Sequence, residues 1–455
     1  MKEIIKSVDE LTAYAQEKLE LNSRDIHYKA NRIMEILESG LTGAESEDAI
    51  FGELSLLPSE VDKRFAEILK TSGGKAATDW LYTYCVNNKY VKKDILDKNP
   101  RFDTLNGLTV TINKAKPEFR DPKKAVAGNS VDGGFAKCVI CRENEGFGAR
   151  NKRNLRTVSI VLGGKHWFWQ YSPYGYFSEH GIAVNCEHTP MRIDRQTLVN
   201  LMDFVDIFPH YFIGCNAPLP RIGGSVLAHD HYQGGGEILP LHKAKIKQYI
   251  KSEKHPDAIV GILDWPGSVI RIKSDKRNEV IDIADGIRKA WVKYSNSELG
   301  IIAEDNDGVH NAISPTVIKT ATGYEMNVIL RSNITSEKYP DGVFHAHPEF
   351  HSVKKESIGL IEAQGLFILP GRLEEELEEV EKIIAEKKPL PPEYAAFKLV
   401  YDETKGLFES GKFNDVHAAM REELGSICYR ILENTAVFKK DEDFMGFLQT
   451  AGFKI

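Results

Sequence analysis

The strongest constraint on the fold is a pattern that occurs twice, in two distant parts of the chain. In "GCNAPLPRIGGSVLAHDHYQ", Asn216 stands thirteen residues before His229. In "RSNITSEKYPDGVFHAHPEF", Asn333 stands twelve residues before His345. Both copies read as a strand, an asparagine, a loop with proline or glycine, a second strand and His-x-His. One His-x-His arises easily by chance, whereas two in matching contexts predict a duplicated α+β unit.

The sequence around the two copies predicts the remaining architecture. Short β-rich runs such as "RTVSIVLGG" and "GIAVNCEH" precede the first copy, and "SVIRIK" precedes the second. Such runs, separated by glycine and proline, are typical of antiparallel sheets. Helical periodicity dominates both ends of the chain. We therefore predict an α+β fold with two similar halves and helical ends. The predicted segments are a helical N-terminal region (1–106), a first half (107–245), a second half (246–371) and a helical C-terminal region (372–455).

Composition excludes several classes of protein. The chain has 455 residues, 42% hydrophobic and 27% charged, with a formal net charge of −7. This balance argues against a general nucleic-acid binder, which normally carries a basic excess. The N-terminal "MKEIIKSVDELTAY" is too charged for a signal peptide, and no apolar run is long enough to cross a membrane. Six scattered cysteines do not form a disulfide framework, so we expect a cytoplasmic protein.

The first His-x-His lies within "GGSVLAHDHYQGGG". Residues two apart on a strand point to the same face, so His229, His231 and Gln233 are expected to line one surface. Gly224 lets the backbone approach a ligand closely, and Ser225 can donate a hydrogen bond there. A lone His-x-His is more often a polar strip or a pair of core histidines. The flanking glycines, the upstream asparagine and the glutamine together favour a binding site.

These residue types indicate group transfer. A neutral imidazole is a nucleophile at pH 7 and can carry a phosphoryl group covalently, which is the role we assign to His231. The amide of Gln233 can donate to a phosphoryl oxygen and stabilise developing charge. An amide cannot act as a general base for water. The combination therefore favours transfer over hydrolysis.

A second constellation has the residue types of a metal site. Cys138 and Cys141 form a C-x-x-C knuckle in "KCVICRENEG". Such a motif alone is equally compatible with a redox pair or with two buried thiols. His188 in "NCEHTPM" and His229 supply two imidazoles, and two thiolates with two imidazoles make a tetrahedral structural zinc site. Zinc on His229 would hold the strand and aim His231.

The second half offers weaker candidates. His345 and His347 face one way on the predicted strand, where they can bind a second metal or simply pack. Glu349 occupies the position that matches Gln233 in the first copy, so a second active centre is not expected.

Beyond them, "HSVKKESIGLIEAQG" contains polar side chains suited to a sugar phosphate. Lys354 and Lys355 can meet a phosphate, while Glu362 and Gln364 can hydrogen-bond sugar hydroxyls. A solvated lysine pair explains the same residues equally well. The basic run "ARNKRNLR", with Arg150, Arg153 and Arg156, we interpret as a solvated face.

Taken together, these segments resemble a hexose-1-phosphate uridylyltransferase of the histidine-triad superfamily. The resemblance is to the second, bacterial class of that family. A similar N-terminal segment, "IHYKANRIMEIL", extends it over most of the chain. Five further segments follow in the same order as in that class, which makes the resemblance specific. They are "CVICRENEGF", "SPYGYFSEHGIAV", "GGSVLAHDHYQGG", "LDWPGSVIRI" and "HAHPEFHSVKKESIGLIEAQG".

The resemblance implies exchange of a uridylyl group between UDP-glucose and galactose 1-phosphate through a uridylyl-histidine at His231. It also implies that Gln233 contacts the α-phosphoryl oxygens, with Asn216, Gly224 and Ser225 near the nucleotide phosphates. The resemblance implies zinc on Cys138, Cys141, His188 and His229, and it suggests a possible second metal on His345, His347 and Glu237. The residues that we expect to bind the hexose phosphate are Lys354, Lys355, Glu362 and Gln364. We expect a homodimer. The first class has proline between its paired histidines, whereas Asp230 intervenes here.

Two other functions stay open at this point. A dinucleoside polyphosphate phosphorylase resembles the same superfamily, and it would bind two nucleosides without a hexose pocket. A zinc-stabilised nucleotide sensor would bind without turnover. Dependence on a hexose 1-phosphate separates the first alternative, and loss of activity in His231→Ala separates the second.

Overall fold

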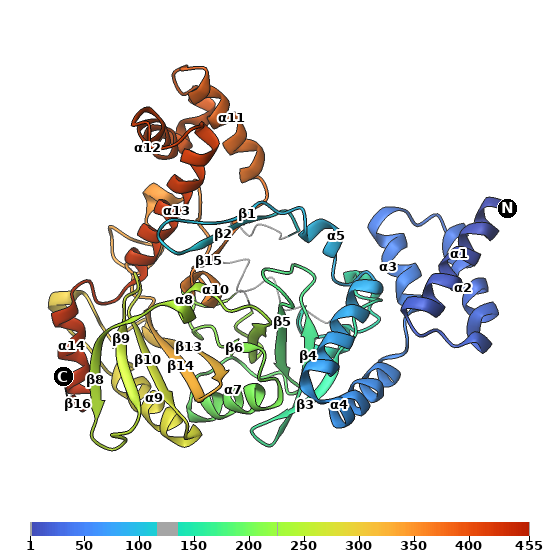
Figure 1. The fold of residues 1–455 in the computed structure, drawn as a ribbon, viewed down its shortest axis with the longest axis horizontal. Coiled ribbons are helices and arrows are strands. Elements are labelled where there is room, and N and C mark those ends of the chain that lie inside the picture. The colour runs from blue at the N-terminus through green and yellow to red at the C-terminus, as the bar shows by residue number, and fades with distance from the viewer. Residues whose placement is uncertain (1, 116–134, 225, 455) are drawn as a thin grey trace.

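The centre of the fold is an eleven-stranded sheet. The computed structural model describes residues 2–115, 135–224 and 226–454. The strands of this eleven-stranded sheet follow the order β16-β8-β9-β10-β14-β13-β6-β7-β5-β4-β3, and each neighbouring pair is antiparallel (Figure 1). The strands are β3 (Val158–Leu162), β4 (Lys165–Tyr171), β5 (Gly181–Asn185), β6 (Phe212–Gly214), β7 (His231–Gly235), β8 (Ile246–Ser252), β9 (Ile259–Leu263), β10 (Val269–Ser274), β13 (Asn311–Thr320), β14 (Gly323–Ser332) and β16 (Phe453–Lys454). The predicted α+β class is confirmed.

The strand order repeats on either side of the β6–β13 pair. The first half runs β3-β4-β5-β7-β6, and the second runs β8-β9-β10-β14-β13. Helix α7 (Arg195–Ile207) follows the third strand of its half, and α9 (Arg277–Trp291) does so in the other. The two helices contact each other and pack on the sheet. The predicted duplication is therefore one continuous sheet with a helix over each half.

The second His-x-His is not on a strand, contrary to the prediction. Strands β13 and β14 form a hairpin paired along all ten residues, and this hairpin fills both sheet positions beside the join. Strand β14 thereby occupies the place that β7 has in the first half. Residues 343–347 follow in a loop, with Gly342 at φ +133° and Pro348 on either side. They lie outside the sheet because no strand position next to β10 is open.

Strand β7 shows the predicted alternation for His231 and Gln233, whereas His229 lies in a bend before the strand and not on it, contrary to the prediction. Tyr232 points toward α7, where its ring stacks on Trp167 at 4.6 Å and its hydroxyl accepts a hydrogen bond from Asn200 at 2.9 Å. His231 and Gln233 therefore point to the opposite face of the sheet. The helix side is the main apolar core, so the face that carries His231 and Gln233 is free for polar groups.

Helices gather at the two ends of the chain, as predicted. The first three helices project from one side of the sheet, and the fourth packs against β3. The helices of residues 373–435 stand above the other half, and the last helix lies at the sheet edge beside β16 (Figure 1). The helices are α1 (Lys2–Lys18), α2 (Ile26–Glu38), α3 (Gly43–Leu54), α4 (Pro58–Asn87), α5 (Lys93–Leu96), α11 (Leu373–Ala385), α12 (Lys398–Glu409), α13 (Val416–Thr435) and α14 (Asp441–Thr450).

A small second sheet joins distant parts of the chain. Its order is β1-β2-β15, and its strands are β1 (Arg101–Asp103), β2 (Thr109–Asn113) and β15 (Leu366–Pro370). Strand β15 pairs with β2 in parallel, so the end of the second half lies beside the start of the first. The boundaries of the four predicted segments stay a prediction.

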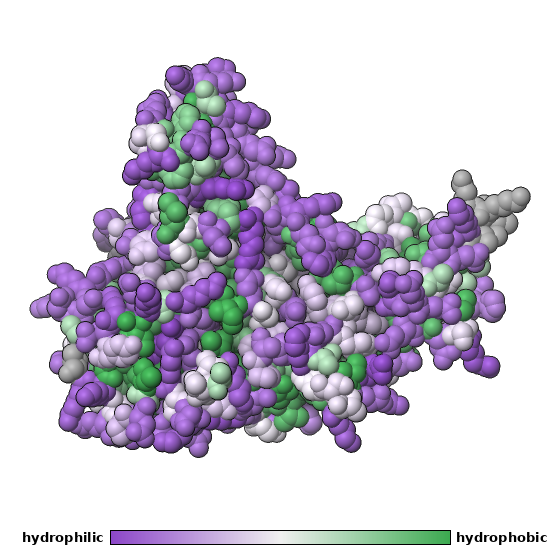
Figure 2. All heavy atoms as spheres, viewed as in Figure 1, coloured by the Kyte–Doolittle hydropathy of each residue, from purple (hydrophilic) through white to green (hydrophobic). Residues whose placement is uncertain are grey.

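Hydrophilic residues cover most of the surface seen in Figure 2, and apolar residues lie there in small groups. Among the helices of the described ranges, none has the length and apolar character to cross a membrane.

The face of the sheet that carries Gln233 continues into a buried polar network in the second half. Strand register runs from Gln233 through Gly214, Thr316 and Asn327 to Arg271, and directly opposed residues share a face. The Arg271 guanidinium donates to Asn327 Oδ1 at 2.8 Å and to two main-chain carbonyls.

Glu325 supplies the negative charge of this network. Its carboxylate lies 3.2 Å from Arg271 and 3.3 Å from His242 Nδ1, and it also pairs with Lys273. Burial alone would raise its pKa, but the hydrogen bonds from His242 and Lys273 and the charge of Arg271 lower the pKa of Glu325 to about 2. The face that carries His231 and Gln233 in the first half is thus filled by paired charges in the second.

Replacing Glu325 by glutamine keeps the shape and removes the charge, which leaves the buried Arg271 guanidinium without a counter-ion. We expect the free energy of unfolding to fall by about 3 kcal/mol, measured by urea denaturation. Glu304→Gln, at an exposed position, serves as the control. An unchanged urea midpoint for Glu325→Gln would show that the ion pair does not stabilise the sheet.

Candidate functional site

The structure brings Cys138, Cys141, His188 and His229 together. Their ligand atoms all lie within 4.8 Å of one another. Cys138 Sγ is 3.3 Å from His229 Nδ1, and Cys141 Sγ is 3.3 Å from His188 Nδ1. Donors on a tetrahedral zinc, with bonds of about 2.0–2.3 Å, are separated by roughly 3.3–3.8 Å. The donor set and its spacing therefore fit a zinc-type ion, and within the described ranges no other group of three or more such residues was found.

Hydrogen bonds prepare this cluster for a cation. His229 Nε2–H donates to the Asn185 carbonyl at 2.8 Å, which leaves the Nδ1 lone pair facing the two sulfurs. A hydrogen bond from Cys138 lowers the pKa of Cys141, which favours a thiolate there.

The basic run after the knuckle is not a solvated face, contrary to our interpretation. Arg150 donates to the Cys138 carbonyl at 2.9 Å, and Lys152 donates to the carbonyl of Val139. Arg153 pairs with Asp48, and Arg156 is buried against main-chain carbonyls. These cations fix the backbone of the knuckle and its surroundings, which is why they lie inward.

His231 stands two residues after the metal-type ligand His229, at the start of β7. Its Nδ1–H donates to the carbonyl oxygen of His229 at 2.8 Å. Burial lowers the pKa of His231 to about 4, so the ring is neutral at pH 7. With the proton on Nδ1, the lone pair is on Nε2, which is the form of imidazole that attacks an electrophile.

Gln233 lies on the same face, and its side chain is held by a histidine that the sequence analysis missed. His180 Nε2–H donates to Gln233 Oε1 at 3.3 Å. Nothing in the spacing of "YFSEHGIAV" relates His180 to the His-x-His-x-Gln motif, because the contact depends on the pairing of β5 with β7.

Asn216 follows β6 and lies against the second half of the chain. Its Oδ1 accepts a hydrogen bond from the Leu360 amide at 2.8 Å, while its buried Nδ2 has no partner among the described residues. A Cβ at Gly224 would lie 2.8 Å from Nδ2, so glycine permits the loop to approach the asparagine. Ser225 lies outside the described residues.

The four residues predicted to bind hexose phosphate do not share one environment. Lys354 is buried, and its ammonium donates to Glu356, Glu362 and the Ile368 carbonyl at 3.1, 2.9 and 3.1 Å. The interpretation of Lys354 as solvated is wrong, whereas Lys355 is exposed.

Gln364 is buried near the join between the two halves. Its Oε1 accepts a hydrogen bond from Thr316 on β13 at 3.0 Å, and its Nε2 has no partner. The short helix α10 (Leu360–Ala363) thus brings Gln364 into contact with Thr316 of β13, while the Leu360 amide at its other end contacts Asn216.

The residues predicted for a second metal are separately engaged. Glu237 pairs with Arg101 and accepts from the Ser178 amide at 3.2 Å. His345 Nδ1 donates to the Ala346 carbonyl, and His347 stacks on Tyr339. They form no ligand group in the part of the chain that the structure describes.

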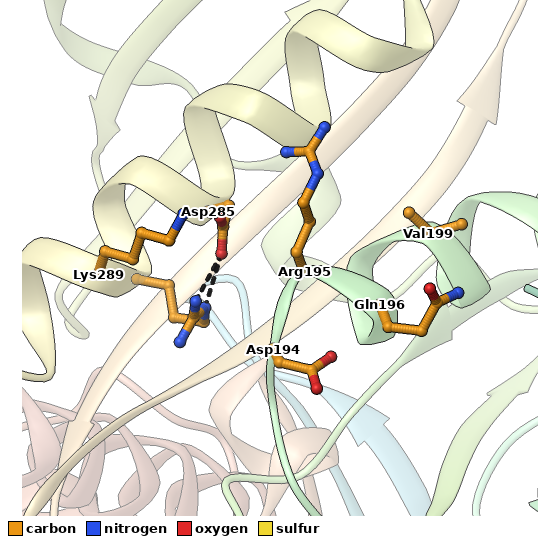
Figure 3. A pocket seen from close by; sticks show the side chains of 7 residues that line it. Asp194, Arg195, Gln196, Val199, Asp285 and Lys289 are labelled. Atoms are coloured by element: carbon orange, nitrogen blue, oxygen red, sulfur yellow. Dashed lines mark hydrogen bonds and ion pairs between the residues drawn. The ribbon is translucent and has the colours of Figure 1, made fainter.

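A shallow groove between α7 and α9 lies on the helix side of the sheet (Figure 3). Its basic side chains are already paired: Arg195 with Asp282, and Arg288 and Lys289 with Asp285. The groove therefore offers no open anion site.

Comparison with known proteins gives a consistent result. A family model described as the C-terminal domain of galactose-1-phosphate uridyl transferase matches residues 175–395. A galactose-1-phosphate uridylyltransferase of Bifidobacterium longum is 55% identical over 408 residues, covering 89% of this chain and 79% of that protein. Proteins of the same name from Fusobacterium nucleatum and Bacillus subtilis are each 37% identical, covering 92% and 87% of this chain and 86% and 80% of those proteins.

Among solved structures, the crystal structure of yeast Ap4A phosphorylase is 12% identical, with a TM-score of 0.35. The match covers 73% of this chain and 92% of that one.

The saturated ammonium of Lys354 leads to a prediction that separates it from its neighbour. Lys354→Met removes the cation from two carboxylates, so we expect the free energy of unfolding to fall by about 3 kcal/mol in urea denaturation. Lys355→Met, at an exposed position, should change it by less than about 0.5 kcal/mol. Equal effects of the two substitutions would contradict the structural role of Lys354.

Proposed function

The chain belongs to the galactose-1-phosphate uridylyltransferase family, and we propose that it exchanges a uridylyl group between UDP-glucose and galactose 1-phosphate. The observation that carries the proposal is the hydrogen bond from His231 Nδ1–H to the His229 carbonyl at 2.8 Å. It fixes a neutral tautomer with a nucleophilic Nε2. The proposed reaction is a double displacement through a covalent uridylyl-His231.

In the first step, His231 Nε2 attacks the α-phosphorus of UDP-glucose. The bond from phosphorus to the bridging oxygen breaks, and glucose 1-phosphate leaves. The imidazole becomes positively charged as the new bond forms, so its Nδ1–H binds the His229 carbonyl more strongly than in the ground state. An interaction that strengthens along the reaction lowers the barrier.

Gln233 is proposed to bind the α-phosphoryl oxygens during this step. Its Oε1 is occupied by His180, which leaves the amide N–H groups to donate. A neutral amide stabilises the phosphoryl charge and does not deprotonate water, which favours transfer over hydrolysis.

In the second step, a phosphate oxygen of galactose 1-phosphate attacks the phosphorus of uridylyl-His231. The phosphorus–nitrogen bond breaks, UDP-galactose leaves, and His231 returns to its neutral form. Asn216, Gly224 and Ser225 are proposed to lie near the nucleotide phosphates. Roles for Lys354, Lys355, Glu362 and Gln364 in binding the hexose phosphate stay predictions.

Zinc is proposed on Cys138, Cys141, His188 and His229. Its role would be structural, because four protein donors leave no open coordination position. Holding the His229 side chain would fix the residue whose carbonyl accepts the hydrogen bond from His231 Nδ1–H. The homodimer and the cytoplasmic location also stay predictions.

The covalent intermediate is tested by mass spectrometry of the intact protein after mixing with UDP-glucose alone. We expect one uridylyl adduct per chain, and we expect galactose 1-phosphate to remove it. His231→Ala should form no adduct, because the only nucleophile is removed. His166→Ala, an exposed histidine on β4, is the matched control and should behave as wild type.

An adduct on His231→Ala would contradict the assignment of the nucleophile. Wild-type protein that binds UDP-glucose and forms no adduct would contradict the double displacement.

The metal is tested by elemental analysis of protein purified without chelator. We expect about one zinc-type ion per chain, retained in Cys186→Ser and lost in Cys141→Ser, because Cys186 is a nearby exposed thiol outside the cluster. Chelation should lower the melting temperature of the wild type. Equal metal content in both variants would place the ion elsewhere.

A further inference from the structure

We infer that His180 is a positioning residue for uridylyl transfer, because its Nε2–H holds Gln233 Oε1 and turns the Gln233 NH2 group toward the phosphoryl oxygens. This inference rests on the proposed function and adds a residue to it. His180 touches neither substrate in this proposal and acts only through Gln233.

The orientation of the Gln233 amide matters because its two ends have opposite chemistry. The NH2 end donates to a phosphoryl oxygen, whereas the carbonyl end repels one, and the two ends have nearly the same shape. Packing alone therefore does not choose between them. A hydrogen-bond partner on one side of the amide does.

The hydrogen bonds of His180 fix which of its nitrogens carries the proton. The Tyr176 amide N–H points at His180 Nδ1 at 3.4 Å, so Nδ1 accepts. Burial lowers the pKa of His180 to about 4, so the ring carries one proton at neutral pH. That proton is on Nε2, 3.3 Å from Gln233 Oε1. A neutral ring in this tautomer offers Gln233 a donor and never an acceptor.

The His180 ring is also held in place. It stacks on Tyr176 with centroids 4.7 Å apart and planes at 21°, and it packs on Phe177 at 4.5 Å. The main-chain carbonyl of His180 accepts a hydrogen bond from the Ser172 amide at 2.8 Å. Strand β5 begins at the next residue and pairs with β7, with Ile182 opposite Gln233. His180, directly before β5, is thus held beside Gln233 by the pairing of β5 with β7.

The test compares two substitutions of similar length. His180→Gln keeps an N–H donor at about the reach of Nε2, whereas His180→Met removes it. In a single turnover of UDP-glucose, we expect His180→Met to form the adduct about 100-fold more slowly, and His180→Gln to recover most of the rate. The Kd for UDP-glucose should change by less than about threefold in both, because the lost interaction acts on the transition state.

A double-mutant cycle separates positioning from structural damage. Gln233→Ala removes the amide that His180 orients. Adding His180→Met to Gln233→Ala should therefore slow the reaction no further, whereas independent damage would multiply the two losses. Thermal unfolding of each variant checks that it is folded. If His180→Met does not fold, the rate of adduct formation by His180→Gln relative to wild type still tests whether a donor at this position supports the reaction.

The outcomes distinguish this inference from the proposed function. Suppose that wild type forms the adduct and His180→Met forms it at the same rate, or that the rate losses of the two substitutions multiply in the double variant. Either result would overturn the role of His180 and leave the proposed function intact. So would a folded His180→Gln as slow as Gln233→Ala. Absence of the wild-type adduct would overturn the proposed function, and this inference with it.

Discussion

The hydrogen bond between His231 and the His229 carbonyl links the two groups of polar residues on which the candidate site depends. One group is the Cys138, Cys141, His188 and His229 cluster, and the other is His231 with Gln233. One residue, His229, offers its imidazole to the thiols of Cys138 and Cys141 and its carbonyl to the neighbouring imidazole. A metal bound to the His229 imidazole would therefore also restrain the His229 carbonyl. The alternation of side chains on β7 then places Gln233 on the same face. The cluster and the proposed nucleophile are therefore adjacent for a physical reason, because the residue His229 contacts both.

The join between β6 and β13 explains how the two halves contribute differently. Both halves present the same sheet face, but β14 carries Glu325 and Asn327 where β7 carries His231 and Gln233. Paired charges and the segment after Gly359 fill that face in the second half. The same segment reaches back, because the Leu360 amide donates to Asn216. The second half therefore contacts the candidate site of the first, and its described residues carry no matching histidine and glutamine on this face.

The sequence predicted what depends on local chemistry. The grouping of Cys138, Cys141, His188 and His229 followed from residue type, because few other arrangements use two thiols and two imidazoles. The α+β class followed from strand periodicity. The placement of His345 on a strand was wrong, because the repeat in the sequence aligned β6 with β14, whereas the sheet aligns β7 with β14. The β13–β14 hairpin occupies the strand position beside β10 that was predicted for the second His-x-His segment. The pairing of a hairpin depends on the register across the sheet, which a local sequence pattern does not show.

The residues that sequence reasoning misjudged share a physical cause. Lys354 was interpreted as either a phosphate ligand or a solvated charge, and His180 was not noticed, because the role of each depends on a partner from another element. An ammonium is a surface group until two carboxylates surround it, and a histidine is unremarkable until a neutral tautomer faces an amide. Burial makes such partners obligatory, since an unpaired polar group inside a protein is strongly destabilising. The buried polar side chains of this face, once paired through the sheet register, therefore identify the supporting residues that a motif search does not reach.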